Sequence, residues 1–78
     1  MFSYNIAKKA DNKAFKDACE AIEENMKDIE KEKLLIDVDG SLVQTYNTPK
    51  GSITVFNDYE VDAVYVDSEV DLFDAFGC

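Results

Sequence analysis

The sequence predicts an α+β fold, a two-layer sandwich in which one amphipathic helix packs on a mostly antiparallel sheet of four to five strands. Three observations predict it. Apolar residues recur at helical spacing over residues 11–31, the period changes to two on either side of that stretch, and turn residues recur through the second half. The expected order is strand, helix and then four strands, and residues 1–78 are expected to form a single domain.

The first strand and the helix are predicted from the spacing of apolar residues. Phe2, Tyr4 and Ile6 alternate with polar residues, which is typical of a short strand. Asp11 or Asn12 offers an N-cap for the helix, and the face opposite its apolar stripe mixes lysine with acidic residues. The stripe consists of Phe15, Ala18, Cys19, Ile22, Met26 and Ile29.

The later strands are predicted between turn signals. Asp39-Gly40 is a strong signal for a two-residue hairpin turn, and residues 47–51 contain proline and glycine at positions suited to a second turn. Residues 67–76 fit a short helix or an extended chain equally well, so both remain open. The four strands are expected at residues 34–38, 42–46, 52–56 and 61–66.

The net charge of −9, from 17 acidic residues and 8 lysines, is unevenly distributed. Residues 1–33 carry seven lysines and eight acids, whereas residues 34–78 carry nine acids and only Lys50. Such a chain is not expected to bind phosphate backbones or anionic membranes. Its hydrophobic content of 46% is too high for a disordered acidic tail. We therefore expect a folded protein with an acidic second half.

Neither catalysis nor metal binding is predicted. The chain has no histidine to serve as a base and no glycine-rich phosphate loop. A calcium loop starting at Asp37 needs glycine at its sixth position and glutamate at its twelfth, where this chain has Leu42 and Thr48. Cys19 and Cys78 form neither a disulfide framework nor a zinc motif. We expect no catalytic residue, no metal and no cofactor.

The start of the chain lacks the apolar core of a signal peptide, and no run approaches the length of a membrane span. A cytoplasmic location without membrane association is therefore expected.

Residues 34–43 resemble the first motif of haloacid dehalogenase-like phosphatases, an apolar strand ending in Asp-x-Asp-Gly-Thr-Leu. The resemblance implies Asp37 as nucleophile and Asp39 as general acid and base. Residues 64–71 are similar to that family's last, magnesium-binding motif, Gly-Asp-Ser-x-x-Asp, but lack its glycine. In the family these motifs end different parallel strands, which need long crossovers, whereas hairpin signals fill the 27 residues that separate Val43 from Asp71 here. A magnesium-dependent phosphatase-like fragment is the further alternative for function.

The acids of the second half alternate along residues 58–62 and 67–71. In an extended chain they would share a face at about 6.6 Å, a spacing comparable with that of phosphates along a nucleic-acid strand. Solubility alone is the plainer explanation of such acids. Phe56 and Tyr65 are nearby aromatic residues of the kind that interfaces use as anchors. The predicted partner-binding residues are Asp37, Asp39, Asp58, Tyr59, Glu60, Asp62, Asp67, Glu69, Asp71 and Asp74.

In overall profile the chain resembles small phage-encoded inhibitors that mimic DNA, the anti-CRISPR and anti-restriction proteins. The resemblance implies a non-enzymatic inhibitor in the host cell cytoplasm that binds the basic nucleic-acid-binding groove of a partner protein, with a CRISPR effector as the most specific target. The first alternative is an immunity or antitoxin-type protein that neutralises a basic nuclease by the same chemistry. Direct binding to nucleic acid or to a membrane is not expected.

Overall fold

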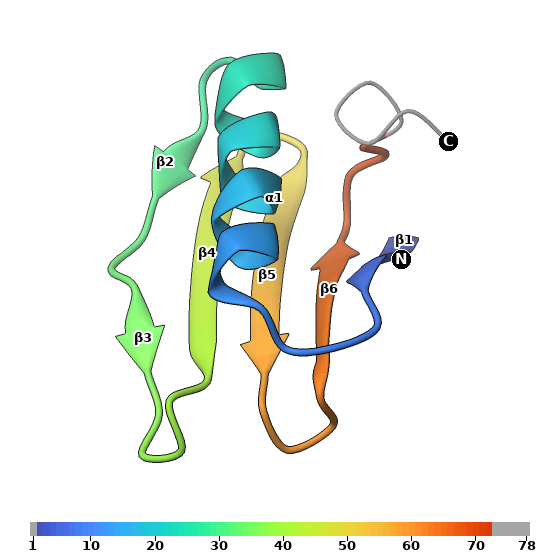
Figure 1. Cartoon of the computed structure of the whole chain (residues 1–78). Coiled ribbons are helices and arrows are strands. Elements are labelled where there is room, and N and C mark those ends of the chain that lie inside the picture. Colours follow the sequence, from blue (N-terminus) through green and yellow to red (C-terminus); the bar gives the residue numbers. More distant parts are fainter. Residues whose placement is uncertain (1, 73–78) are drawn as a thin grey trace.

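The computed structural model describes residues 2–72 and confirms the α+β class: one helix packs against a six-stranded antiparallel sheet (Figure 1). The sheet order is β1-β6-β5-β4-β2, and β3 also pairs with β4. The first strand therefore lies beside the last one, at the edge far from β2 and β3. The elements are β1 (Phe2–Ala7), α1 (Asn12–Asn25), β2 (Glu30–Lys31), β3 (Leu35–Ile36), β4 (Leu42–Thr48), β5 (Gly51–Asp58) and β6 (Ala63–Ser68).

The helix begins where the sequence predicts but ends earlier. The Asp11 carboxylate caps its first turn by accepting two backbone N–H groups. The prediction that it continues to residue 31 is wrong, because the backbone becomes extended at Met26 and left-handed at Asp28 (φ 59°). The Asn25 side chain donates to a carbonyl of the preceding turn, a local bond typical of helix ends. Ile29 consequently packs against the core from outside the helix.

The edge beside β4 is an interrupted strand. The predicted strand over residues 34–38 is reduced to β3, and residues 30–31, predicted as helix, form β2. Both short strands pair with β4, at Glu30↔Asn47 and Leu35↔Val43. This division explains why the sheet has six strands rather than the predicted four to five.

The last two long strands are displaced from their predicted bounds. β5 runs on to Asp58, and β6 starts at Ala63 rather than at residue 61. Of the segment left open between helix and extended chain, residues 67–68 belong to β6 and residues 69–72 form neither helix nor strand. Residues 73–78, which include Asp74 and Cys78, lie outside the described part of the chain.

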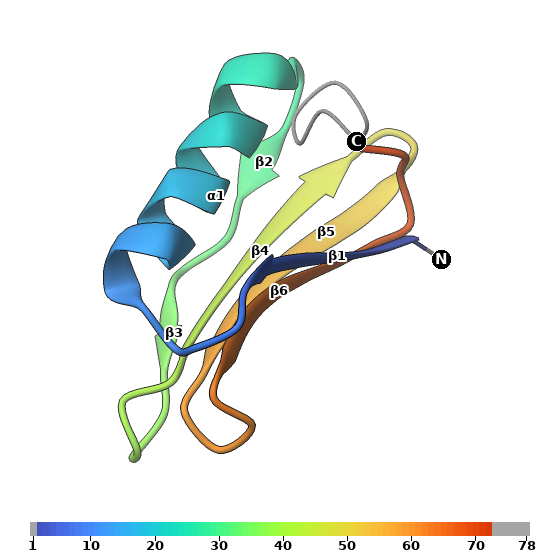
Figure 2. The same ribbon diagram turned by 45° about the vertical axis from the view of Figure 1, so that its right-hand side comes forward.

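The core lies between α1 and one face of the sheet (Figure 2). The first four residues of the predicted helical stripe are buried, while Met26 and Ile29 pack at the margin. Tyr46 is fully buried and its hydroxyl donates to Glu23, so burial and this hydrogen bond raise the pKa of Tyr46. The buried apolar residues are Phe15, Ala18, Cys19, Ile22, Tyr46, Ile53, Val55, Val64, Val66 and Leu72.

Replacing Ile22, the fully buried centre of the helical stripe, should destabilise the fold strongly. We expect Ile22→Ala to lower the free energy of unfolding by about 2–5 kcal/mol, because it leaves a cavity between helix and sheet. Val61→Ala, at a residue that is 62% exposed, is the control and should change it by less than about 0.5 kcal/mol. Urea denaturation followed by circular dichroism measures both, and equal effects would contradict the described core.

Candidate functional site

Two turns at one end of the sheet bring acidic residues together. The β3–β4 and β5–β6 turns lie at the same end of the molecule, opposite the β4–β5 turn (Figure 1). A shallow cavity of about 200 Å³ lies between them. No lysine lines this cavity. Its lining includes four carboxylates, two from each side, which are those of Asp37, Asp39, Asp58 and Glu60. We call these four residues the acidic end.

The β3–β4 turn is built by its own hydrogen bonds. The N–H of Asp37 donates to the carbonyl of Ser41 (2.8 Å), and the N–H of Gly40 donates to the carbonyl of Asp37 (3.0 Å). Gly40 has φ 90°, a conformation that favours glycine. The hairpin is thus confirmed, but its loop has three residues rather than the two of Asp39-Gly40.

Asp39 is fixed within this turn. Its carboxylate accepts the backbone N–H of Ser41 (2.9 Å), and the backbone and side-chain hydrogen bonds of Ser41 hold the pKa of Asp39 below its ordinary value. The Asp39 carboxylate is therefore charged and oriented at neutral pH.

The β5–β6 turn is held by Asp58. One oxygen of its carboxylate accepts the N–H groups of Glu60 (2.9 Å) and Val61 (3.2 Å), and the other accepts the Tyr65 hydroxyl (3.3 Å). Asp62 is left-handed (φ 56°), and its carboxylate accepts the N–H of Ala10 (2.9 Å). The prediction that residues 58, 60 and 62 share one strand face is wrong, because Glu60 and Asp62 lie in this turn.

The two turns are joined to each other and to the helix. The N–H of Tyr59 donates to the hydroxyl of Ser41 (3.0 Å), and the Tyr59 hydroxyl donates to the side chain of Asn12 (3.1 Å) at the start of α1. These bonds fix the acidic end relative to the core.

The remaining predicted residues lie elsewhere. Asp67 is on the sheet face opposite α1, where it accepts the hydroxyl of Ser3 (2.9 Å). Glu69 binds the N–H and hydroxyl of Ser52, and Asp71 accepts the Tyr4 hydroxyl (3.2 Å). The structure thus brings Asp37, Asp39, Asp58, Tyr59, Glu60 and Asp62 to one end and separates them from Glu69 and Asp71.

The two phosphatase-like motifs do not meet in one site. Asp37 and Asp39 lie in a hairpin turn between antiparallel strands, whereas Asp71 lines a cavity beside the β4–β5 turn at the other end. Within residues 2–72, no three carboxylate or cysteine side chains are placed to hold a metal ion.

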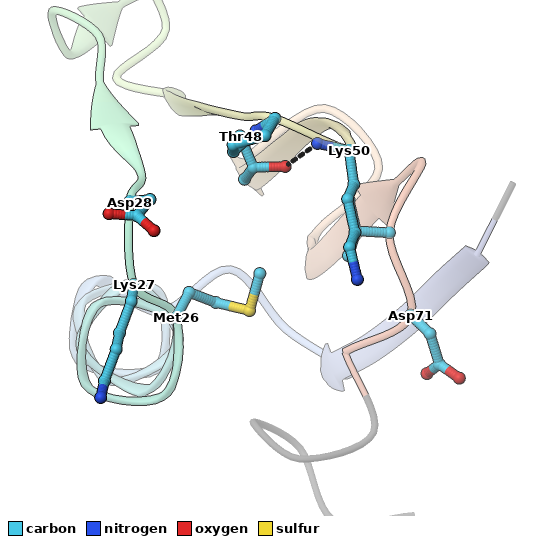
Figure 3. Close-up of a pocket in the computed structure, with 8 residues that line it drawn as sticks. Met26, Lys27, Asp28, Thr48, Lys50 and Asp71 are labelled. Carbon is cyan, nitrogen blue, oxygen red and sulfur yellow. Dashed lines mark hydrogen bonds between the residues drawn. The ribbon is translucent and has the colours of Figure 1, made fainter.

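Sequence reasoning did not find that second cavity, of about 340 Å³ (Figure 3). Met26 and Lys50 extend into it, while Lys27 points away from it. Two lysines and the carboxylates of Asp28 and Asp71 share its lining, so it lacks the single sign of charge found at the acidic end. Its residues come from three distant segments, and no local pattern links them.

No protein-family model, no curated protein and no solved structure matches this chain significantly. No helix in the described part of the chain is long and apolar enough to cross a bilayer.

The hydrogen bonds to Asp39 predict a pH dependence. Because its folded-state pKa lies below the ordinary value of about 3.9, ionised Asp39 favours the folded state. This stabilisation of the fold is fully present at pH values above the pKa of Asp39 in the unfolded chain. It is lost as the pH falls through the lower pKa of Asp39 in the folded protein. A carboxyl-carbon NMR titration should give a depressed pKa for Asp39, and Asp39→Asn should remove its share of the acid destabilisation. A titration at or above the ordinary value would contradict the described turn.

Proposed function

We propose that this protein is a non-enzymatic acidic inhibitor whose acidic end occupies a basic nucleic-acid-binding groove of a partner protein. The proposal is carried by one observation: carboxylates from two separate turns line one cavity that has no lysine in its lining. A lysine- or arginine-rich groove is the surface that complements such a site. While the acidic end is bound, the partner's nucleic acid is excluded.

The carboxylates are oriented before any partner binds. Backbone N–H groups of the same turns hold Asp39 and Asp58, so little side-chain freedom is lost on association. An ionised carboxylate has about four acceptor sites, and these turn bonds use only part of them. The remaining sites can accept hydrogen bonds from lysine or arginine, as phosphate oxygens do.

Apolar side chains lie between the acids. Ile36 and Val38 flank Asp37, and Tyr59 and Val61 flank Glu60, and all four apolar side chains are exposed. Protein interfaces commonly combine exposed apolar residues with a polar rim, whereas a surface that only confers solubility has no need of them. This favours a protein partner over a purely solubilising role.

A CRISPR effector loaded with guide RNA is the first partner to test, and a basic nuclease is the second. Both present cationic grooves to nucleic acid, so the carboxylates would stand in for phosphates in either case. Antiparallel strands around Asp37 and Asp39, and the distance of this turn from Asp71, support a binding role over phosphatase chemistry.

The decisive variant removes charge without removing turn hydrogen bonds. Because Asp58 and Asp62 hold their turn, lysine there would damage the fold, so amides are preferable. The fourfold variant Asp37→Asn, Asp39→Asn, Asp58→Asn and Glu60→Gln should weaken binding to guide-loaded effectors by at least about tenfold at low salt. It should also flatten the dependence of affinity on ionic strength, measured by biolayer interferometry.

The matched control carries the same loss of charge on exposed positions away from the site: Asp17→Asn, Glu20→Gln, Glu24→Gln and Asp28→Asn. It should retain most of the affinity and the steep salt dependence. Equal weakening by both variants would show that net charge alone matters. An affinity that does not change with salt concentration would contradict the proposal that the carboxylates mimic phosphates.

A further inference from the structure

An apolar row crosses the sheet face that α1 does not cover. Leu35 pairs with Val43, Val43 with Phe56, and Phe56 with Tyr65, so these side chains stand side by side on four adjacent strands. Figure 2 shows α1 on one side of the sheet and no other described element over its opposite face. We call Leu35, Val43, Phe56 and Tyr65 the apolar row.

This composition is unusual for a solvated sheet face. An antiparallel sheet with one open face normally alternates apolar residues toward the core with polar residues toward water. Val55 and Val66 follow that rule, because they are buried in the core. Phe56 and Tyr65 do not, because their stacked aromatic rings lie on the outer face, with centroids 4.7 Å apart. Leu35 extends the row and is 60% exposed.

Carboxylates border the row on both long sides. Asp58 lies two residues beyond Phe56 on the same face, toward the acidic end, and contacts the Tyr65 hydroxyl. Asp67 lies two residues beyond Tyr65 on the opposite side. Thr54 pairs with Asp67, and Thr45 pairs with Thr54 on the next strand. Both are uncharged, so no lysine interrupts this border.

The dimensions of the row fit a helix. Four adjacent strands span about 14 Å, or roughly two and a half helical turns. Neighbouring row residues are about 4.8 Å apart, close to the 5–6 Å between side chains three or four residues apart on a helix. An added strand would instead lie along an edge of the sheet, beside β1 or beside β2 and β3.

We propose that the apolar row is the docking site for a basic amphipathic helix of the partner protein. The helix lies across the strands, with its apolar stripe on the row and its lysine or arginine side chains toward Asp58 and Asp67. This rests on the proposed function, because the same partner would meet the acidic end. Basic helices are common elements of nucleic-acid-binding surfaces. A second copy of this chain, itself strongly acidic, does not supply the required charge.

The test uses an end-capped peptide of leucine and lysine, about 14 residues long, with leucine at helical spacing. Its control has the same composition in strict alternation, the strand pattern. In an NMR titration of the labelled protein, the helical peptide should shift the amide signals of Val43, Phe56 and Tyr65 most. It should bind at least about tenfold more tightly than the alternating peptide.

Two matched variants decide the location. Leu35→Ser should weaken binding of the helical peptide about tenfold, since it removes one exposed apolar contact from the row. Leu34→Ser changes the neighbouring leucine, which is 38% exposed and lines a cavity beside α1, and should stay within about twofold of the parent protein. Val43→Thr is a second variant of the row, and it keeps a side chain branched at Cβ, which suits a strand.

Equal affinities for the Leu35→Ser and Leu34→Ser variants, or shifts confined to the acidic end, would overturn the docking site and leave the proposed function standing. Binding of the helical peptide at the row, together with no binding to guide-loaded effectors or to basic nucleases, would instead overturn the proposed function.

Discussion

A buried amide at the end of β5 positions the acidic end. The Asn57 side chain is fully buried; it accepts the N–H of Asp11 (3.1 Å) and donates to the side chain of Asn12 (2.8 Å). Burying an amide is costly unless it is hydrogen-bonded, so α1 must begin directly over the end of β5. Asn12 also accepts the Tyr59 hydroxyl, and Tyr59 contacts the neighbouring hairpin. The start of the helix, the core and both acidic turns therefore depend on one arrangement of polar groups.

One helix can cover only one face of this sheet, and that limit shapes the rest of the surface. The inner face receives the helical stripe around Ile22, and the outer face carries the apolar row and its bordering carboxylates. Acidic side chains steer association and orientation, whereas apolar contacts supply affinity that salt does not screen. The acidic end and the apolar row adjoin at Asp58, which belongs to the acidic end and accepts the hydroxyl of Tyr65 in the row. In the proposed function they together form a protein-binding surface with two physically distinct contributions.

The sequence predicted the fold class, a helix cap at Asp11 or Asn12, and the turns near residues 39–40 and 47–51, because each has a local chemical signal. It failed at Ile29, where helical spacing of apolar residues continues although the helix has ended. It also failed at Asp62, because the alternation of acids suggested a strand. The signal for the turn is Asp58, whose carboxylate accepts the backbone N–H of the residue two positions later. The apolar row depends on strand register, and tertiary contacts between two turns place Asp39 and Asp58 in the lining of one cavity. Neither arrangement could be predicted from local sequence.

The central claim is that the acidic end and nucleic acid compete for one groove. The most direct measurement is the apparent dissociation constant of this protein for a guide-loaded CRISPR effector, measured at increasing concentrations of target DNA under constant salt. Competition predicts that the apparent constant rises linearly with the DNA concentration, without a plateau, and that this protein displaces bound DNA. An apparent constant that does not change with DNA, or a stable ternary complex, would contradict the account.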